Sequence, residues 1–174
     1  MFLAGILVMA AINDLWRQKI PNLLTFPTIC VGLCYHSVIN GLDGLLFSAG
    51  GLALGIGLFI LPYFMGGMGA GDAKLMGAVG AIVGAKGVFI AFVFTAIAGG
   101  VYAVILLLIN WRYSLRFLAR HKTTIKTFLR TAQFIPIPSA ESEKKPRLCY
   151  GVAIAAGTFG YIFSQLWGYN FLNP

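Results

Sequence analysis

The sequence predicts an all-α polytopic membrane protein with about six transmembrane helices. Hydrophobic residues make up 59% of the 174 residues and charged residues only 10%, whereas a soluble domain has roughly 25% charged residues. The apolar residues fall into six successive stretches. Because backbone polar groups cannot stay unpaired in lipid, each stretch should form a helix. At roughly 20 residues per crossing, little room remains for anything else.

The first stretch reads as a membrane helix rather than a cleavable signal peptide. No basic residues precede it, and Asn13-Asp14-Leu15-Trp16 stands where a small-residue cleavage site would be needed. The connections between stretches are short except for the basic segment 110–148. We therefore expect a single membrane-embedded domain over residues 1–174, with a basic loop at 110–148. The stretches are Phe2–Ile20, Leu23–Ile39, Leu45–Met65, Asp72–Val83, Val88–Ile109 and Tyr150–Trp167.

The positions of the Lys and Arg residues predict the orientation in the membrane. With the N-terminus outside, twelve of the thirteen cations lie inside and only Lys86 lies outside, as the positive-inside rule requires. Both termini are then expected on the outer side. Two sets of cations in the basic loop are spaced four residues apart with apolar residues between them, which indicates either an interfacial helix or ordinary positive-inside flanking. The sets are Arg112, Arg116 and Arg120, and Lys122, Lys126 and Arg130. The net charge of +8 therefore indicates contact with membrane lipids, not with nucleic acid.

Asp14 is expected at membrane depth, close to the inner surface. The thirteen residues before it cover only about 20 Å of a ~30 Å hydrocarbon core, so the first helix must continue to near Ile20. There Pro21 disfavours helix in the residue before it. Ionisable groups at this depth are rare and are functional by default.

Asp72 is expected at the same depth and on the same side. It ends the glycine-rich run Gly66-Gly67-Met68-Gly69-Ala70-Gly71 and begins the fourth helix. Non-helical backbone at membrane depth occurs only inside protein or beside water. Asp43, by contrast, precedes an apolar run on the outer side and fits a helix N-cap.

Two neighbouring carboxylates share a proton, because both cannot ionise easily. One then acts as a base on water, while the other polarises a scissile carbonyl, which is aspartyl-protease chemistry and needs no metal or cofactor. Helix N–H groups favour a charge on Asp72, so we expect Asp72 to be the base and Asp14 to carry the shared proton. Lys74 could pair with a catalytic carboxylate, which we favour, or with lipid phosphate. Cation or proton transport, and plain helix capping with close glycine packing, remain open alternatives.

At these residues the chain resembles the type IV prepilin peptidase family of GxGD membrane aspartyl proteases. Gly69-Ala70-Gly71-Asp72 fits GxGD, and Ala73-Lys74-Leu75-Met76-Gly77 continues it in the family manner. Asp14 ahead of Ile20-Pro21-Asn22 resembles the family's first-aspartate motif. The resemblance implies Asp14 and Asp72 as catalytic residues. The residues that it implies in support are Gly69, Gly71, Lys74, Pro21 and Asn22.

The resemblance also implies cleavage of a prepilin leader peptide at the cytoplasmic side of the bacterial inner membrane. Larger members carry a cytoplasmic methyltransferase domain with paired Cys-x-x-Cys motifs, whereas here only Ile20–Leu23 separates the first two stretches. The size and the late Tyr150-Gly151-Val152-Ala153 stretch resemble the tight-adherence (Flp-type) pilus branch, although Cys149 stands where that branch has proline. The expected partner is a Flp-type prepilin or pseudopilin.

Two alternatives from other classes use the same features differently. A small cation- or proton-coupled transporter could use the same two aspartates, but transporters often show two similar halves, and none is evident. A purely structural pilus-assembly subunit would need neither aspartate. Among GxGD enzymes, the signal-peptide and presenilin type expects a Tyr-Asp pair, where this chain has Asn13-Asp14.

Overall fold

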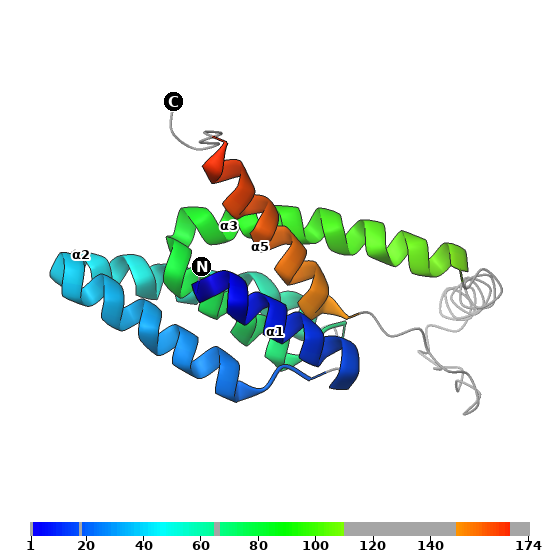
Figure 1. The fold of residues 1–174 in the computed structure, drawn as a ribbon, viewed down its shortest axis with the longest axis horizontal. Helices are drawn as coiled ribbons and strands as arrows, with labels where there is room; N and C mark the ends of the chain where they lie inside the picture. The colour runs from blue at the N-terminus through cyan, green and yellow to red at the C-terminus, as the bar shows by residue number, and fades with distance from the viewer. Residues whose placement is uncertain (1, 18, 65–66, 110–148, 168–174) are drawn as a thin grey trace, which may run out of the picture. The chain divides into compact units, whose positions relative to one another are not determined.

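The computed structural model describes residues 2–17, 19–64, 67–109 and 149–167, and all of its elements are helices. No strand occurs within these ranges, so the predicted all-α class is confirmed for them. The basic segment 110–148, with its expected interfacial helix, lies outside the described residues. The elements are α1 (Phe2–Arg17), α2 (Asn22–Phe64), α3 (Ala70–Ile109) and α5 (Tyr150–Leu166) (Figure 1).

The two long elements are each broken at a glycine. Gly41 in α2 has φ 59° and ψ −133°, and Gly84 in α3 has φ 75° and ψ 177°. Such backbone conformations are available to glycine and strained for other residues. The chain turns back sharply at each of them (Figure 1). Both breaks fall where the sequence separates two apolar stretches, so the described helical segments follow the predicted order.

Two elements, α2 and α3, are long and apolar enough to cross a membrane by length and composition. The total of six crossings and the outer position of both termini remain predictions. The helix ends differ slightly from expectation. α1 ends at Arg17, short of Ile20, and α3 begins at Ala70, two residues before Asp72. Residues 19–21 belong to no helix, and the carbonyl of Pro21 accepts the N–H of Leu24 in the first turn of α2 (3.0 Å).

Side chains from α2 satisfy the backbone at the break in α3. Ser48 Oγ donates to the carbonyl of Ala81 at 2.6 Å, and His36 Nε2 donates to the carbonyl of Ile82 at 3.0 Å. The last carbonyls of a helix lack partners within it, and in an apolar environment they need them from elsewhere. His36 therefore caps a helix end.

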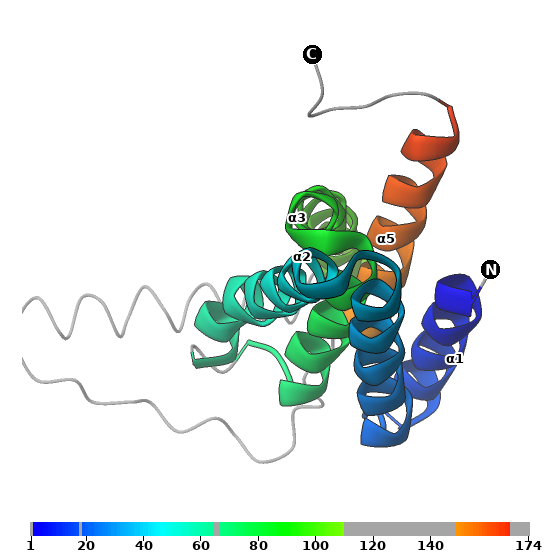
Figure 2. The ribbon, with the colours of Figure 1, turned by 90° about the vertical axis from the view of Figure 1, so that its left-hand side faces the viewer.

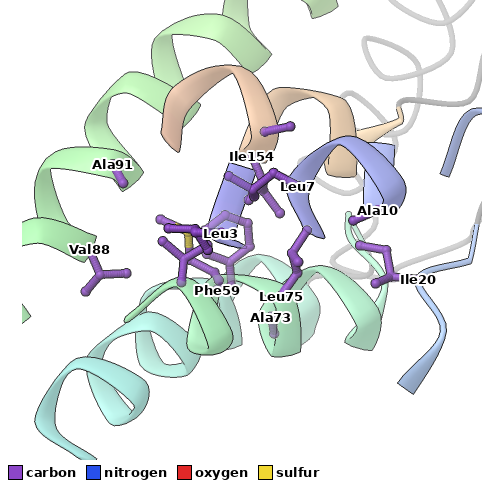
Figure 3. Close-up of a cluster of buried hydrophobic side chains, with 13 residues drawn as sticks. Leu3, Leu7, Ala10, Ile20, Phe59, Ala73, Leu75, Val88, Ala91 and Ile154 are labelled. Carbon is purple, nitrogen blue, oxygen red and sulfur yellow. The ribbon is translucent and has the colours of Figure 1, made fainter. Parts of the chain in front are cut away.

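The chain divides into two compact units, and all features below belong to the first, Met1–Gly100 with Cys149–Pro174. In this unit α1 packs against α5 and α2, and Figure 2 shows α1 alongside the first part of α2. Buried side chains from all four elements and from the α1–α2 connection form one cluster, shown in Figure 3. Between α2 and α3 the backbones come so close that a Cβ on Gly51 would overlap the carbonyl of Gly80. The labelled members of the cluster are Leu3, Leu7, Ala10, Ile20, Phe59, Ala73, Leu75, Val88, Ala91 and Ile154.

Candidate active site

Asp14 lies on the buried side of α1, near its C-terminal end. The buried residues of this helix are Leu3, Leu7, Ala10 and Asp14, a spacing that forms one stripe along a helix of 3.6 residues per turn. Asp14 is 6% exposed. The same periodicity that packs α1 into the core therefore carries a carboxylate inside the protein.

The carboxylate of Asp14 is held by the start of α5. Its Oδ2 accepts a hydrogen bond from the backbone N–H of Gly151 at 2.8 Å, and this bond is buried. Gly151 is the second residue of α5, where N–H groups have no partner within the helix. A carboxylate is favoured at such a position by the exposed N–H groups and by the helix dipole.

Asp72 lies in the first turn of α3 and is 8% exposed. Its Oδ2 accepts a hydrogen bond from the backbone N–H of Gly69 at 3.0 Å. In return, the N–H of Asp72 donates to the carbonyl of Gly69 at 3.1 Å. Gly69 directly precedes α3, so Asp72 takes the helix position from which an acidic side chain reaches back to the capping residue. The GxGD loop thus forms a local cap as well as a carboxylate site.

The α1–α2 connection lies directly against the GxGD loop. A Cβ added at Gly71 would lie 3.1 Å from Cβ of Ile20 and 3.5 Å from its backbone N and O. Ile20 lies in the connection after α1 and is itself buried. This approach brings the end of α1 to the start of α3. The charge of Asp14 acts on Asp72, so the two carboxylates lie in the same region of the protein.

Each carboxylate keeps one oxygen without a hydrogen bond to the described part of the chain. In both aspartates Oδ2 accepts from a glycine N–H, and neither Oδ1 accepts from a described residue. An oxygen that faces an N–H donor is poorly placed to carry a proton toward that donor. The Oδ1 atoms are therefore the oxygens best placed to share a proton, or to bind water and substrate.

The expectation that Lys74 lies beside a catalytic carboxylate is wrong for this structure. Its Nζ donates to Oδ1 of Asn22 at 3.1 Å and lies 5.5 Å from the ring centroid of Phe26. The physical reason is helix geometry, because side chains two positions apart, such as Asp72 and Lys74, do not face each other. Lys74 and Asn22 instead connect the start of α3 to the start of α2.

Two other sequence expectations need correction or extension. Asp43 is exposed and makes no side-chain hydrogen bond with a described residue, so it does not act as the expected N-cap. Gly151 was not singled out as a site residue. The signal that could have found it is its place in Tyr150-Gly151-Val152-Ala153, because a small residue at a helix start allows another group to approach the N–H. Within the described ranges no three His, Cys, Asp or Glu side chains form a metal-binding group, and independence from metal remains a prediction.

These features define a helical membrane protein with a buried pair of carboxylates. Residues 1–104 match the Type IV leader peptidase family. This match covers more than half of the chain and includes both aspartates. The chain therefore belongs to the Type IV leader peptidase family.

Two curated relatives show the same likeness. Both are named "Prepilin leader peptidase/N-methyltransferase" and come from Burkholderia pseudomallei, strains 1026b and K96243. Each is 33% identical over 124 residues, which is 66% of this chain and 38% of the relative. The chain thus spans less than half the length of the curated relatives it matches. No solved structure matches the chain at a significant level.

Proposed function

We propose that this chain is a membrane aspartyl endopeptidase that cleaves the leader peptide of a prepilin-like protein, with Asp14 and Asp72 as its catalytic pair. The observation that carries the proposal is that α1 and α3 each bury one carboxylate, that each has Oδ2 bound by a glycine N–H, and that the two interact electrostatically. Family membership supplies the reaction class. Neither carboxylate is partnered by a cation among the described residues that would explain its burial as an ion pair.

The chemistry follows from one proton shared by the pair. The ionised aspartate takes a proton from a water molecule, and the water oxygen attacks the carbonyl carbon of the scissile peptide bond. The protonated aspartate donates a hydrogen bond to the carbonyl oxygen, which gains negative charge as the tetrahedral intermediate forms. The C–N bond then breaks, and the leaving amine takes up a proton from the pair.

The position of each aspartate against a helix start does not decide which of the two is the base and which is the acid. The expectation that Asp72 is the base relied on the N-terminus of α3, which favours a negative charge. Asp14 is bound in the same way by the N-terminus of α5. Helix starts therefore favour a negative charge on both carboxylates and do not distinguish the base from the acid.

The proposed location is the bacterial inner membrane, crossed several times, with the site at the cytoplasmic side and both termini periplasmic. The cation distribution supports this orientation. The breaks at Gly41 and Gly84 also support it, because the chain could reverse direction at each of them on the outer side, opposite the side proposed for the two aspartates.

The proposed substrate is a Flp-type prepilin or pseudopilin, cut after a glycine and before the hydrophobic stem. Support comes from the short connection between α1 and α2, which ends at Asn22 and leaves no room for a domain at that place. Membrane lipids are the other expected partner, through the basic residues of the 110–148 segment.

The test is cleavage by the purified protein reconstituted in liposomes. A Flp-type prepilin is added, and the new N-terminus is read by mass spectrometry. The proposal predicts a single cut directly after the glycine of the leader. An intact prepilin after prolonged incubation with the correctly inserted wild-type protein would contradict the proposed function.

A further inference from the structure

We infer that Gly151 is a positioning residue for Asp14: its backbone N–H and its lack of a side chain hold Oδ2 of that carboxylate and leave Oδ1 for the reaction. This inference rests on the proposed catalytic role of Asp14. It assigns a part in the site to the first turn of α5, which lies far from both aspartate motifs in the sequence.

The contact leaves no space for another residue at position 151. A Cβ there would lie 2.9 Å from Cβ of Asp14, 2.9 Å from its Oδ2 and 3.1 Å from its Cγ. Contacts under 3.0 Å are essentially never made by a real Cβ, so a side chain would displace the carboxylate or α5. The N–H to Oδ2 distance of 2.8 Å is within the range of charge-assisted bonds.

The side chain at the N-cap position of α5 does not cap this helix, which is the independent reason to assign this role. The N-cap position is Cys149, and it makes no side-chain capping hydrogen bond. Helices usually satisfy their first N–H groups with a Ser, Thr, Asp or Asn at this position. Here Asp14, 137 residues away in the chain, supplies the acceptor. The carboxylate of Asp14 thus caps the start of α5, and the N–H of Gly151 in turn fixes one oxygen of that carboxylate.

The two carboxylates differ in what their glycine contact requires. Gly69 and Asp72 are three residues apart, so that contact forms within the GxGD loop. The contact between Asp14 and Gly151 forms only when α5 packs on α1, where Leu7 and Ile154 are both fully buried in the common cluster. Docking of α5 is thus a condition for orienting Asp14. A substitution at Gly151 should therefore alter catalysis although both aspartates are still present.

The functional test compares two alanine variants of α5 in steady-state cleavage of a prepilin by the reconstituted full-length protein. Gly151→Ala should lower kcat by about a hundredfold, the loss expected from a misplaced catalytic group, with little change in KM. Because the lost N–H bond favours the carboxylate, the acid limb of the pH–rate profile should also move to higher pH. Gly160→Ala is the matched control, since its Cβ would lie an ordinary 3.5 Å from Phe94.

The inference is contradicted if Gly151→Ala keeps the wild-type kcat and pH profile, or if Gly160→Ala shows the same changes. A second measurement does not depend on the folding of Gly151→Ala. In ¹⁵N-glycine-labelled protein in detergent, the Gly151 amide signal should move with pH in the wild type and in Asp72→Asn, but not in Asp14→Asn. A signal with the same pH response in Asp14→Asn would overturn the inference. If the wild type cuts no prepilin, the proposed function fails, and this signal still decides whether Gly151 holds Asp14.

Discussion

Lys74 Nζ in α3 donates a hydrogen bond to Oδ1 of Asn22, the first residue of α2, at 3.1 Å. The two residues come from different motifs, the GxGD continuation and the Ile-Pro-Asn segment. Their contact joins the starts of the two long elements beside the carboxylate pair. It explains the presence of a lysine and an asparagine in the motifs without giving either a part in proton transfer.

The first prediction follows from this contact. Lys74→Met should lower the cleavage rate only a few-fold, because a hydrogen bond of this kind contributes about 1 kcal/mol. The pH–rate profile should not move, since Lys74 pairs with an amide and not with a carboxylate. Asn22→Ala should lower the cleavage rate by a similar factor. The double variant should lower it no further than either single variant, because both remove the same hydrogen bond. A displaced acid limb in Lys74→Met would show that the ammonium acts on the carboxylate pair.

The second prediction concerns Gly71, because a side chain there would make a tight contact with Ile20. In Gly71→Ala the new Cβ would lie 3.1 Å from Cβ of Ile20, so Ile20 or the loop beside Asp72 must move by a few tenths of an ångström. We expect cleavage to fall about tenfold, equal to ~1.4 kcal/mol of transition-state stabilisation. Gly57→Ala is the control, since nothing lies within 4 Å of its Cβ. Equal activities of the two variants in the same assay would contradict the close approach.

The third prediction concerns the two breaks, Gly41 and Gly84. Gly41→Ala should destabilise the protein by roughly 1–3 kcal/mol through backbone strain alone, because its Cβ would meet open space. Gly84→Ala should destabilise it more, because the Cβ would also overlap the ring of Phe47. Thermal unfolding in detergent measures both. A Gly84→Ala variant that unfolds at a higher temperature than Gly41→Ala would refute this order.

The order of helical segments was largely predictable from the sequence, because lipid exposure demands long apolar stretches and the turns between them contain glycine. The end of α1 at Arg17 was not, since Pro21 restricts only the residue before it, and what happens further upstream depends on packing. The partners of Asp14 and Lys74 were also not predictable. Gly151 and Asn22 are distant in the chain, and no local pattern specifies which helix start meets which side chain.

Pairing of the two carboxylates was predictable from topology, since both motifs were expected at one depth on one side. In the structure the charge of Asp14 acts on Asp72, whereas their pairing in catalysis remains a prediction. The expected cap at Asp43 failed for a local reason: the chain breaks at Gly41, two residues earlier, and Asp43 is exposed within the helical residues that follow.

The fourth prediction concerns topology. Reporter fusions after Val83 and at the C-terminus should give a periplasmic signal, because the cation distribution places both outside. Fusions after Met65 and within 123–142 should give a cytoplasmic signal. If one of the first two fusions gave a cytoplasmic signal and one of the second two gave a periplasmic signal, the two aspartates would not share the cytoplasmic side.

The measurement that tests the central claim most directly is prepilin cleavage by Asp14→Asn and Asp72→Asn, followed by gel mobility of the pilin and by immunoblot of the inserted enzyme. Each substitution keeps the size of the side chain and removes the carboxylate that the shared proton needs. Each should lower cleavage by roughly a thousandfold, within the range that general acid–base catalysis contributes. Asp43→Asn is the matched control and should keep wild-type activity, since Asp43 is exposed and forms no side-chain hydrogen bond with a described residue. Full processing by either Asp14→Asn or Asp72→Asn would contradict the account.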